Sequence, residues 1–368
     1  MKRRANLLIK GDYNPCPELP NEINLSSFVS HRHDSKSAKK LISFDKSKIE
    51  NVSEWQIKAR EKLIELMSYD RSLIKVNEKY KKQLPSIKGV KRLRYYLEGF
   101  DGNDIPVTLL WSDKVNIHSI LICLAGSASG VHLLWGESLM PSDPDRLLMG
   151  ADVGLQAVEN GFLAVCIEQR CFGEREEREL KPRSSARCVD SFMHSLLIGR
   201  TLIGENVTDV STVISWLETY SLPAEVTNRK NVWLYGHSTG GTHAVYSAAV
   251  DERIKGVIAS GCISPITESL LKRRNPEGDA ILPGFLKWFE YHDLVCLCAP
   301  KPFIAIGGKK DHIFPDPEML KVIKKASQVY KVFNAENNIH VITGHEGHRM
   351  YTEEMWHIVK NYVPKITR

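Results

Sequence analysis

Continuous apolar runs alternate with helical periodicity along most of the chain beyond residue 119. The apolar run Ser119–Leu124 is followed by a helical pattern over Ala151–Glu159 and by a second apolar run over Phe162–Ile167. A strand that is apolar at every position is buried on both faces, and helices that join such strands produce a mostly parallel sheet. The same pattern predicts strands over Asn231–Tyr235, Ile254–Ala259, Pro302–Ile306 and Asn338–Thr343. It predicts helices over 202–220, near 317–331 and near 352–362, and a small-residue helix through Ala244, Val245, Ala248 and Ala249.

The chain before residue 119 has a different pattern. Apolar residues recur at helical spacing from Ser53 to Met67, which predicts a helix with Ser53 as its N-cap. The β-like runs Arg92–Leu97 and Ile105–Trp111 flank an Asp101-Gly102 turn and predict an antiparallel hairpin. We therefore expect an α/β fold with an eight-stranded, mostly parallel twisted sheet flanked by helices.

Two segments do not fit this alternation. Residues 1–52 combine polar residues with three prolines, so we expect an irregular N-terminal arm packed on a main domain formed by residues 53–368. Residues 264–299 interrupt the order of strands and helices, and we expect them to form a small lid inserted beside the carboxyl edge of the sheet.

Composition and charge narrow the class of protein. Of the 368 residues, 42% are hydrophobic and 26% charged, which excludes collagen-like and fully disordered chains. The first hundred residues hold 22 Lys and Arg against 12 Asp and Glu, so the net charge of +6 arises there. Because no aromatic interleaving accompanies it, we interpret this excess as a solvated basic face and expect no nucleic-acid partner. An anion-binding interaction module that uses this region is the rival interpretation.

The cysteines and the apolar runs indicate the cellular compartment that we expect for this protein. Eight cysteines without a CxxC pair predict free thiols in a reducing compartment. No apolar signal core and no apolar run of about 18 residues is present, so a cytoplasmic protein without a membrane partner is expected. Neither an HExxH motif nor a Cys/His ligand spacing occurs, and we expect no metal and no cofactor.

The strongest chemical motif is Gly236-His237-Ser238-Thr239-Gly240, which follows an apolar strand and precedes a small-residue helix. In this G-x-S-x-G setting a tight strand-to-helix turn forces the central residue into a strained conformation, and its hydroxyl projects above the sheet. Ser238 is therefore the predicted nucleophile. The alternative is a Gly/Ser turn that only connects a strand to a helix.

A serine hydroxyl needs a base, and the base needs an acid that orients it. Asp311 follows the strand that ends near Ile306, and Asp316 is its rival. His345 and His348 both follow the last strand, and we favour His348 because it stands just before the final helix. The predicted triad is Ser238, Asp311 and His348.

Acyl transfer also needs hydrogen-bond donors for the developing oxyanion. The backbone N–H of Thr239 supplies one. The second is expected from the small-residue loop that follows Leu124, where Ser127 is the predicted donor and Ala128 the alternative.

These residues together resemble the α/β-hydrolase superfamily, and most closely its dienelactone-hydrolase and acetyl-xylan-esterase-like branch. The resemblance covers residues 53–365 and includes Glu168-Gln169-Arg170-Cys171-Phe172-Gly173-Glu174-Arg175 and Leu282-Pro283-Gly284. Ala125-Gly126 departs from the His-Gly that this branch places in its oxyanion loop. Trp135, Arg170 and Phe172 are candidate substrate-binding residues, although Arg170 could instead pair with Glu168 or Glu205 as a structural ion.

The resemblance and the triad predict a serine esterase that cleaves a small-molecule ester through an acyl-enzyme. The resemblance favours a short acyl chain, such as that of an acetylated carbohydrate. A peptidase or amidase of the same fold and a catalytically silent binding protein are the alternatives. Exposed aromatic residues near the lid would permit a homodimer.

Overall fold

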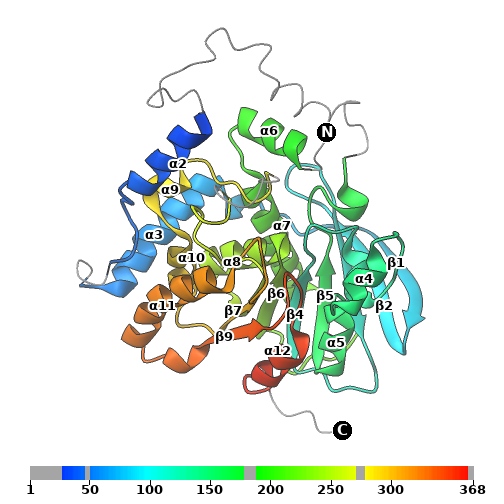
Figure 1. Ribbon diagram of the computed structural model, residues 1–368. Helices are drawn as coiled ribbons and strands as arrows, with labels where there is room; N and C mark the ends of the chain where they lie inside the picture. The colour runs from blue at the N-terminus through cyan, green and yellow to red at the C-terminus, as the bar shows by residue number, and fades with distance from the viewer. Residues whose placement is uncertain (1–26, 46–49, 178–187, 271–277, 364–368) are drawn as a thin grey trace, which may run out of the picture. The chain divides into compact units, whose positions relative to one another are not determined.

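The computed structural model describes residues 27–45, 50–177, 188–270 and 278–363, and Figure 1 labels its helices and strands. The chain divides into two compact units, Met1–Ala38 and Lys39–Arg368. In the first unit the described residues form helix α2 (Ser27–Ser37), whereas we predict irregular chain there. The helix has no buried residue, so no apolar periodicity marks it. The rest of the predicted arm includes residues 1–26 and 46–49, which lie outside the described residues.

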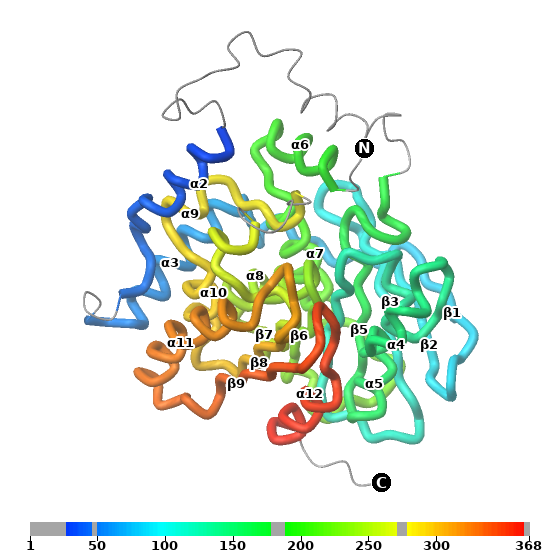
Figure 2. Tube along the Cα trace, viewed as in Figure 1, coloured from blue at the N-terminus to red at the C-terminus, as the bar shows by residue number. Residues whose placement is uncertain are grey.

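The second unit contains one nine-stranded sheet with the order β1-β2-β3-β5-β4-β6-β7-β8-β9. The strands β1, β2 and β3 pair antiparallel in that order, and β3 pairs antiparallel with β5. The remaining pairs, along the order β5-β4-β6-β7-β8-β9, are all parallel. Figure 2 shows β6, β7, β8 and β9 following one another across this sheet. The strands are β1 (Glu78–Ile87), β2 (Val90–Leu97), β3 (Ile105–Trp111), β4 (Ser119–Leu124), β5 (Phe162–Ile167), β6 (Val232–His237), β7 (Ile254–Ser260), β8 (Phe303–Gly308) and β9 (Ile339–Gly344).

The predicted count of eight strands is one too low, because β1 is missing from the prediction. β1 is an edge strand without a buried residue, and its sequence is rich in lysine. Lysines on an edge strand hinder pairing with a further strand, and they also remove the apolar signal on which strand prediction depends. The eight predicted strands correspond to β2 through β9.

Helices cover both faces of the sheet, and the side chains of its central strands alternate between two cores. On β4, Ile120 and Ile122 join one hydrophobic cluster, whereas Leu121 and Cys123 join the other. The first cluster contains residues of α3 (Val52–Met67), α7 (Leu202–Thr219), α8 (Thr239–Val250), α10 (Tyr291–Cys298) and α11 (Asp316–Val332). The second contains residues of α5 (Val153–Glu159) and α12 (Thr352–Val359). The remaining helices are α4 (Asp143–Leu148), α6 (Val189–Leu197) and α9 (Phe285–Trp288).

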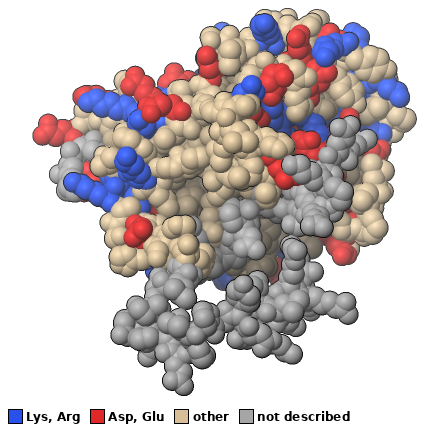
Figure 3. Space-filling view, turned by 90° about the horizontal axis from the view of Figure 1, so that it is seen from above, with Lys and Arg blue, Asp and Glu red and all other residues tan. Residues whose placement is uncertain are grey.

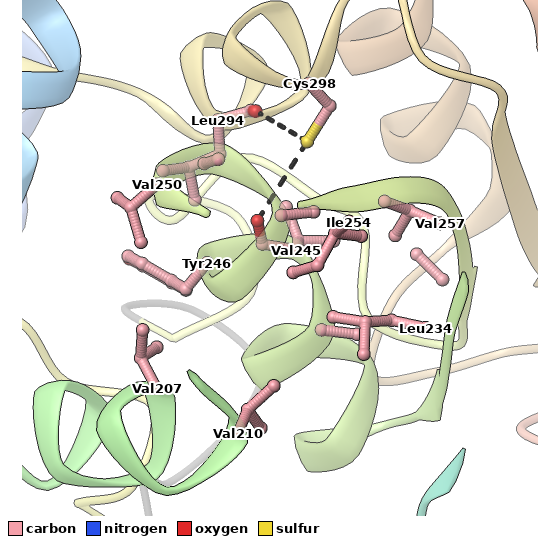
Figure 4. Packing of buried hydrophobic residues seen from close by; sticks show 14 of the residues in the cluster. Val207, Val210, Leu234, Val245, Tyr246, Val250, Ile254, Val257, Leu294 and Cys298 are labelled. Atoms are coloured by element: carbon pink, nitrogen blue, oxygen red, sulfur yellow. Dashed lines mark hydrogen bonds between the residues drawn. The ribbon is translucent and has the colours of Figure 1, made fainter. Parts of the chain in front are cut away.

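Figure 4 shows the first cluster where α7, α8 and α10 meet strands β6 and β7. The Cys298 thiol on α10 lies 3.3 Å from the Leu294 carbonyl oxygen and 4.0 Å from that of Val245 on α8. All eight residues of α10 are buried. Residues 291–298 of the predicted lid therefore form a core helix, and it packs against α8 and α11. Residues 271–277 of the predicted lid lie outside the described residues.

Two arginines on β2, in the antiparallel part of the sheet, form ion pairs with carboxylates. Arg92 and Arg94 on β2 pair with Glu137 and Glu174 at 2.7 and 2.6 Å. On the face seen in Figure 3, residues of both signs are interspersed. Among the described residues, no helix is long and apolar enough to cross a lipid bilayer.

Candidate active site

Ser238 stands alone between the end of β6 and the start of α8, in a strained backbone conformation with φ 54° and ψ −121°. Two glycines make this turn possible. A Cβ atom on Gly236 would lie 2.1 Å from the carbonyl oxygen of Gly240, and one on Gly240 would lie 2.3 Å from that of Ala125. The backbone N–H of Ser238 donates to the Ser260 carbonyl on the neighbouring strand β7. The turn therefore holds the serine at the carboxyl edge of the sheet, as the motif predicts.

The strain at Ser238 predicts that glycine stabilises the protein at this position. Positive φ disfavours any residue with a Cβ atom by about 1–3 kcal/mol, whereas glycine adopts it without a steric penalty. We expect Ser238→Gly to exceed Ser238→Ala in free energy of unfolding by about 1 kcal/mol in urea denaturation. Equal stability of the two variants would show that the turn carries no strain.

Asp311 and His348 come from adjacent strands and form a hydrogen-bonded pair. His348 follows β9, and its Nδ1 lies 2.7 Å from Oδ2 of Asp311, which follows β8. The other carboxylate oxygen of Asp311 accepts the backbone N–H groups of Ile313 and Phe314 at 2.8 and 2.9 Å. Asp311 is 4% exposed, and the Phe314 ring stacks on the imidazole. These contacts fix both the carboxylate and the face of the imidazole.

The rival residues lie elsewhere. Asp316, at the start of α11, accepts a hydrogen bond from the Thr343 hydroxyl at 2.7 Å. His345 is exposed and is absent from the described lining of the cavity that contains Ser238. The geometry therefore pairs Asp311 with His348, and the order of the sequence alone left both choices open.

Ser238 and His348 line the same cavity, of about 210 Å³. Its lining consists of Gly126, Ser127, Arg146, Met149, His237, Ser238, Ile313, His348 and Met350. The His237 ring contacts that of His348, with their centroids 4.8 Å apart. Burial lowers the pKa of His237 well below its usual value, and the charges of His348 and Arg146 lower it further. His237 is therefore neutral at pH 7, while its Nδ1 lies 3.0 Å from the Ser260 hydroxyl.

The loop after β4 approaches Ser238 closely. A Cβ atom on Gly126 would lie 3.3 Å from the Cβ of Ser238, and the Ser127 and Thr239 hydroxyls are 2.7 Å apart. Thr239 is fully buried at the first position of α8. The structure thus brings both predicted oxyanion residues to the nucleophile turn, and it places Ala128 in the same loop as a buried residue.

A carboxylate that the sequence analysis did not single out braces this loop. Asp143 is fully buried at the start of α4, and it accepts hydrogen bonds from the Ser129 hydroxyl and from the backbone N–H groups of Leu139 and Met140. His132 Nε2 lies 2.8 Å from its Oδ2. Burial alone would raise the pKa of Asp143, but these hydrogen bonds lower it. Asp143 therefore supports the loop in which Ala125 replaces the expected histidine.

Glu168 lies beneath the same loop, and it predicts a pH dependence of stability. Its carboxylate accepts the backbone N–H of Val131, and burial raises its pKa from 4.5 to about 7. The folded state then binds more protons than the unfolded state between these pH values, so stability falls as pH rises from about 4.5 to 7. The contribution is about 3 kcal/mol. Glu168→Gln should flatten the curve of unfolding free energy against pH by this amount in urea titrations from pH 5 to 8.

Exposed Glu353 provides the control, because Glu353→Gln should leave the slope unchanged. Parallel curves of unfolding free energy against pH for Glu168→Gln and the wild type would contradict the raised pKa of the Glu168 carboxyl.

The three predicted substrate-binding residues do not line the cavity of Ser238 in the part of the chain that the structure describes. Trp135 is buried in the second core, and its indole N–H donates to Glu137. Phe172 packs in a small cluster with Cys171 and Cys188.

Arg170 is 4% exposed, and all five of its N–H groups are used by carboxylates. They contact Asp101, Glu205 and Asp209 at 2.6 to 3.1 Å. The structural interpretation of Arg170 therefore fits its surroundings better than substrate contact. Within the described ranges, no group of three or more His, Cys, Asp or Glu residues could hold a metal ion.

Comparison with known proteins shows which family and which folds this chain resembles. The model of the Abhydrolase family matches residues 25–361. YtaP of Bacillus subtilis (strain 168), provisionally named a hydrolase, is 25% identical over 191 residues, which cover 51% of this chain and 60% of its own length. A Bacteroides fragilis NCTC 9343 structure, provisionally named an acetyl xylan esterase, has a TM-score of 0.69 at 17% identity, over 89% of this chain and 84% of its own. A glucuronoyl esterase from Teredinibacter turnerae T7901 has a TM-score of 0.61 at 13% identity, over 89% and 90%.

Proposed function

This chain belongs to the Abhydrolase family, and from that premise we propose that it is a serine hydrolase that cleaves carboxylic esters through an acyl-enzyme. One observation carries the proposal: His348, which is hydrogen-bonded to the buried Asp311, lines the same cavity as Ser238. A hydroxyl, an imidazole and a buried carboxylate in this order are the groups that nucleophilic acyl transfer needs.

Each residue has a distinct role in the proposed reaction. His348 takes the proton of the Ser238 hydroxyl as that oxygen attacks the ester carbonyl, and Asp311 holds the imidazole in the tautomer that accepts it. The backbone N–H groups of Thr239 and Ser127 stabilise the oxyanion, with Ala128 as the alternative donor. His348 then returns its proton to the leaving alcohol, and water hydrolyses the acyl-enzyme.

The cavity supports a small acyl group. Its volume of about 210 Å³ is below the roughly 300–1,000 Å³ of pockets that bind drug-sized ligands. The structures of similar fold are named for esters of carbohydrates, which supports an acetylated sugar as one substrate to examine. The alcohol part would then lie outside this cavity.

Covalent labelling tests the proposal. A fluorophosphonate probe should add to the wild-type protein at Ser238, identified by mass spectrometry of the peptide, and should not label Ser238→Ala. Hydrolysis of p-nitrophenyl esters should be fastest for acetate and fall as the acyl chain lengthens to octanoate. A wild-type protein that neither labels nor hydrolyses p-nitrophenyl acetate would be the catalytically silent binding protein instead. Faster cleavage of a matched anilide than of the ester would favour an amidase.

A further inference from the structure

Arg146 lines the cavity of Ser238, and the proposed mechanism gives this cation no role. It is the fourth residue of α4, is half-buried, and lines both this cavity and an adjoining hollow of about 30 Å³. Within the described part of the chain, its guanidinium has no ion-pair or hydrogen-bond partner. By contrast, Arg92, Arg94, Arg170 and Arg253 each contact a carboxylate within 2.6–2.7 Å.

Arg146 is the one Lys or Arg among the described lining residues of the cavity, and no Asp or Glu is among them. The carboxylate of the proposed triad, on Asp311, is hydrogen-bonded to His348 and to backbone N–H groups. The charge of Arg146 contributes to lowering the pKa of His237 beside the nucleophile, so its field reaches the reacting end of the cavity.

The backbone that carries Arg146 is held on two sides. At its start, Asp143 ties α4 to Ser129 in the loop of the predicted oxyanion donors. At its end, Leu147 and Met350 pack on one small apolar cluster, and Arg349 donates to the Leu148 carbonyl at 3.4 Å. Met350 and Arg349 directly follow His348. Arg146 is thus fixed between the oxyanion loop and the base, where its side chain can meet a bound ester.

A guanidinium without a partner in such a place is suited to a carboxylate. Its planar fork binds a carboxylate through two parallel hydrogen bonds, and charge-assisted bonds of this kind are about twice as strong as neutral ones. Met149, Ile313 and Met350 contribute apolar side chains to the lining, which suits the carbon atoms between an ester and a second acidic group.

We propose that Arg146 selects esters that carry a carboxylate close to the scissile bond. This inference rests on the proposed function, since it names the substrate class of the same site. The carboxylate can belong to the acyl half or to the alcohol half of the ester. The two cases share the same contact with Arg146 and are separated by the substrates of the test.

Two matched pairs of substrates make the test. For the acyl half, p-nitrophenyl hemisuccinate is compared with neutral p-nitrophenyl butyrate. For the alcohol half, 4-acetoxybenzoate is compared with neutral 4-acetoxybenzamide. The readout is the ratio of kcat/KM for the charged and neutral members, after subtraction of spontaneous hydrolysis. We expect the wild type to prefer the charged member of one pair by about tenfold, and the pair that shows the preference identifies the half.

Arg146→Met should bring that ratio close to one, whereas Arg146→Lys should retain part of the preference because it keeps the charge without the fork. Lys309→Met is the matched control, since Lys309 is an exposed cation near the end of β8 and outside the cavity lining; its ratio should equal that of the wild type. A wild-type ratio near one in both pairs, or a ratio that Arg146→Met leaves unchanged, overturns the inference while ester hydrolysis itself stands.

A binding measurement decides the inference even without turnover. By titration calorimetry, either 4-hydroxybenzoate (alcohol half) should bind the wild type more tightly than 4-hydroxybenzamide, or succinamate (acyl half) more tightly than succinamide, and Arg146→Met should abolish the difference. Equal binding within both pairs by the wild type contradicts recognition of a carboxylate by Arg146. Failure of the proposed esterase function is seen separately, as absence of fluorophosphonate labelling.

Discussion

Replacement of His348 by alanine is expected to lower kcat for p-nitrophenyl acetate by roughly four orders of magnitude. Without the imidazole, the hydroxyl of Ser238 has no acceptor for its proton, and only the oxyanion donors and substrate binding remain to accelerate the reaction. KM should change much less, because the imidazole acts chiefly in the transition state. Steady-state kinetics with the purified variant measure both constants.

His345→Ala is the matched control. Both histidines lie in the segment between β9 and α12, but His345 is exposed and His348 is bonded to Asp311 at 2.7 Å. His345→Ala should keep kcat within about threefold of the wild type, since surface substitutions away from the chemistry have small effects. A reversal of the two results would identify His345 as the base and would leave the observed His348–Asp311 contact without a catalytic role.

Replacement of Arg170 by methionine is expected to destabilise the protein by about 3 kcal/mol or more. Arg170 follows β5 and joins Asp101, in the turn between β2 and β3, to Glu205 and Asp209 on α7. Methionine fills similar space but leaves three buried or half-buried carboxylates short of a counter-charge. Thermal unfolding followed by circular dichroism should show a Tm lower by roughly 5 °C.

The kinetics of the folded variant separate structure from substrate contact. Below its Tm, Arg170→Met should keep a KM close to that of the wild type, since Arg170 does not line the cavity of Ser238. Exposed Arg71 gives a control, and Arg71→Met should leave the Tm within about 1 °C. A raised KM at unchanged Tm would instead restore Arg170 as a substrate-binding residue.

The parallel part of the sheet could be predicted because its strands carry an unambiguous signal. Residues 120–124 send alternate side chains into two different cores, so all five positions must be apolar. Lysine-rich β1 lacks this constraint, and no pattern of burial marks it. The match to the Abhydrolase family confirms the predicted superfamily.

The candidate site likewise has residues that the sequence predicts and residues that it does not. The glycines around Ser238 are required because a Cβ atom on Gly236 or Gly240 would lie 2.1–2.3 Å from a backbone carbonyl oxygen, and so the motif is visible in the sequence. The choice of His348 over His345 depends on how one short turn folds after β9, which spacing alone does not determine. Arg146 lies in a polar segment that matches no motif, and its importance arises only from the tertiary contacts that place α4 beside His348.

The close approach of Gly240 to the Ala125 carbonyl also bears on how the proposed esterase could acquire new substrates. Since the turn bearing the nucleophile abuts the neighbouring loop with no side chain between them, neither can be remodelled while the other stays in place. Variation that alters preference without loss of turnover is therefore expected at other side chains of the cavity lining, namely Arg146, Met149, Ile313 and Met350. Libraries directed at those four positions would sample new specificities while the turn at Ser238 stays unchanged.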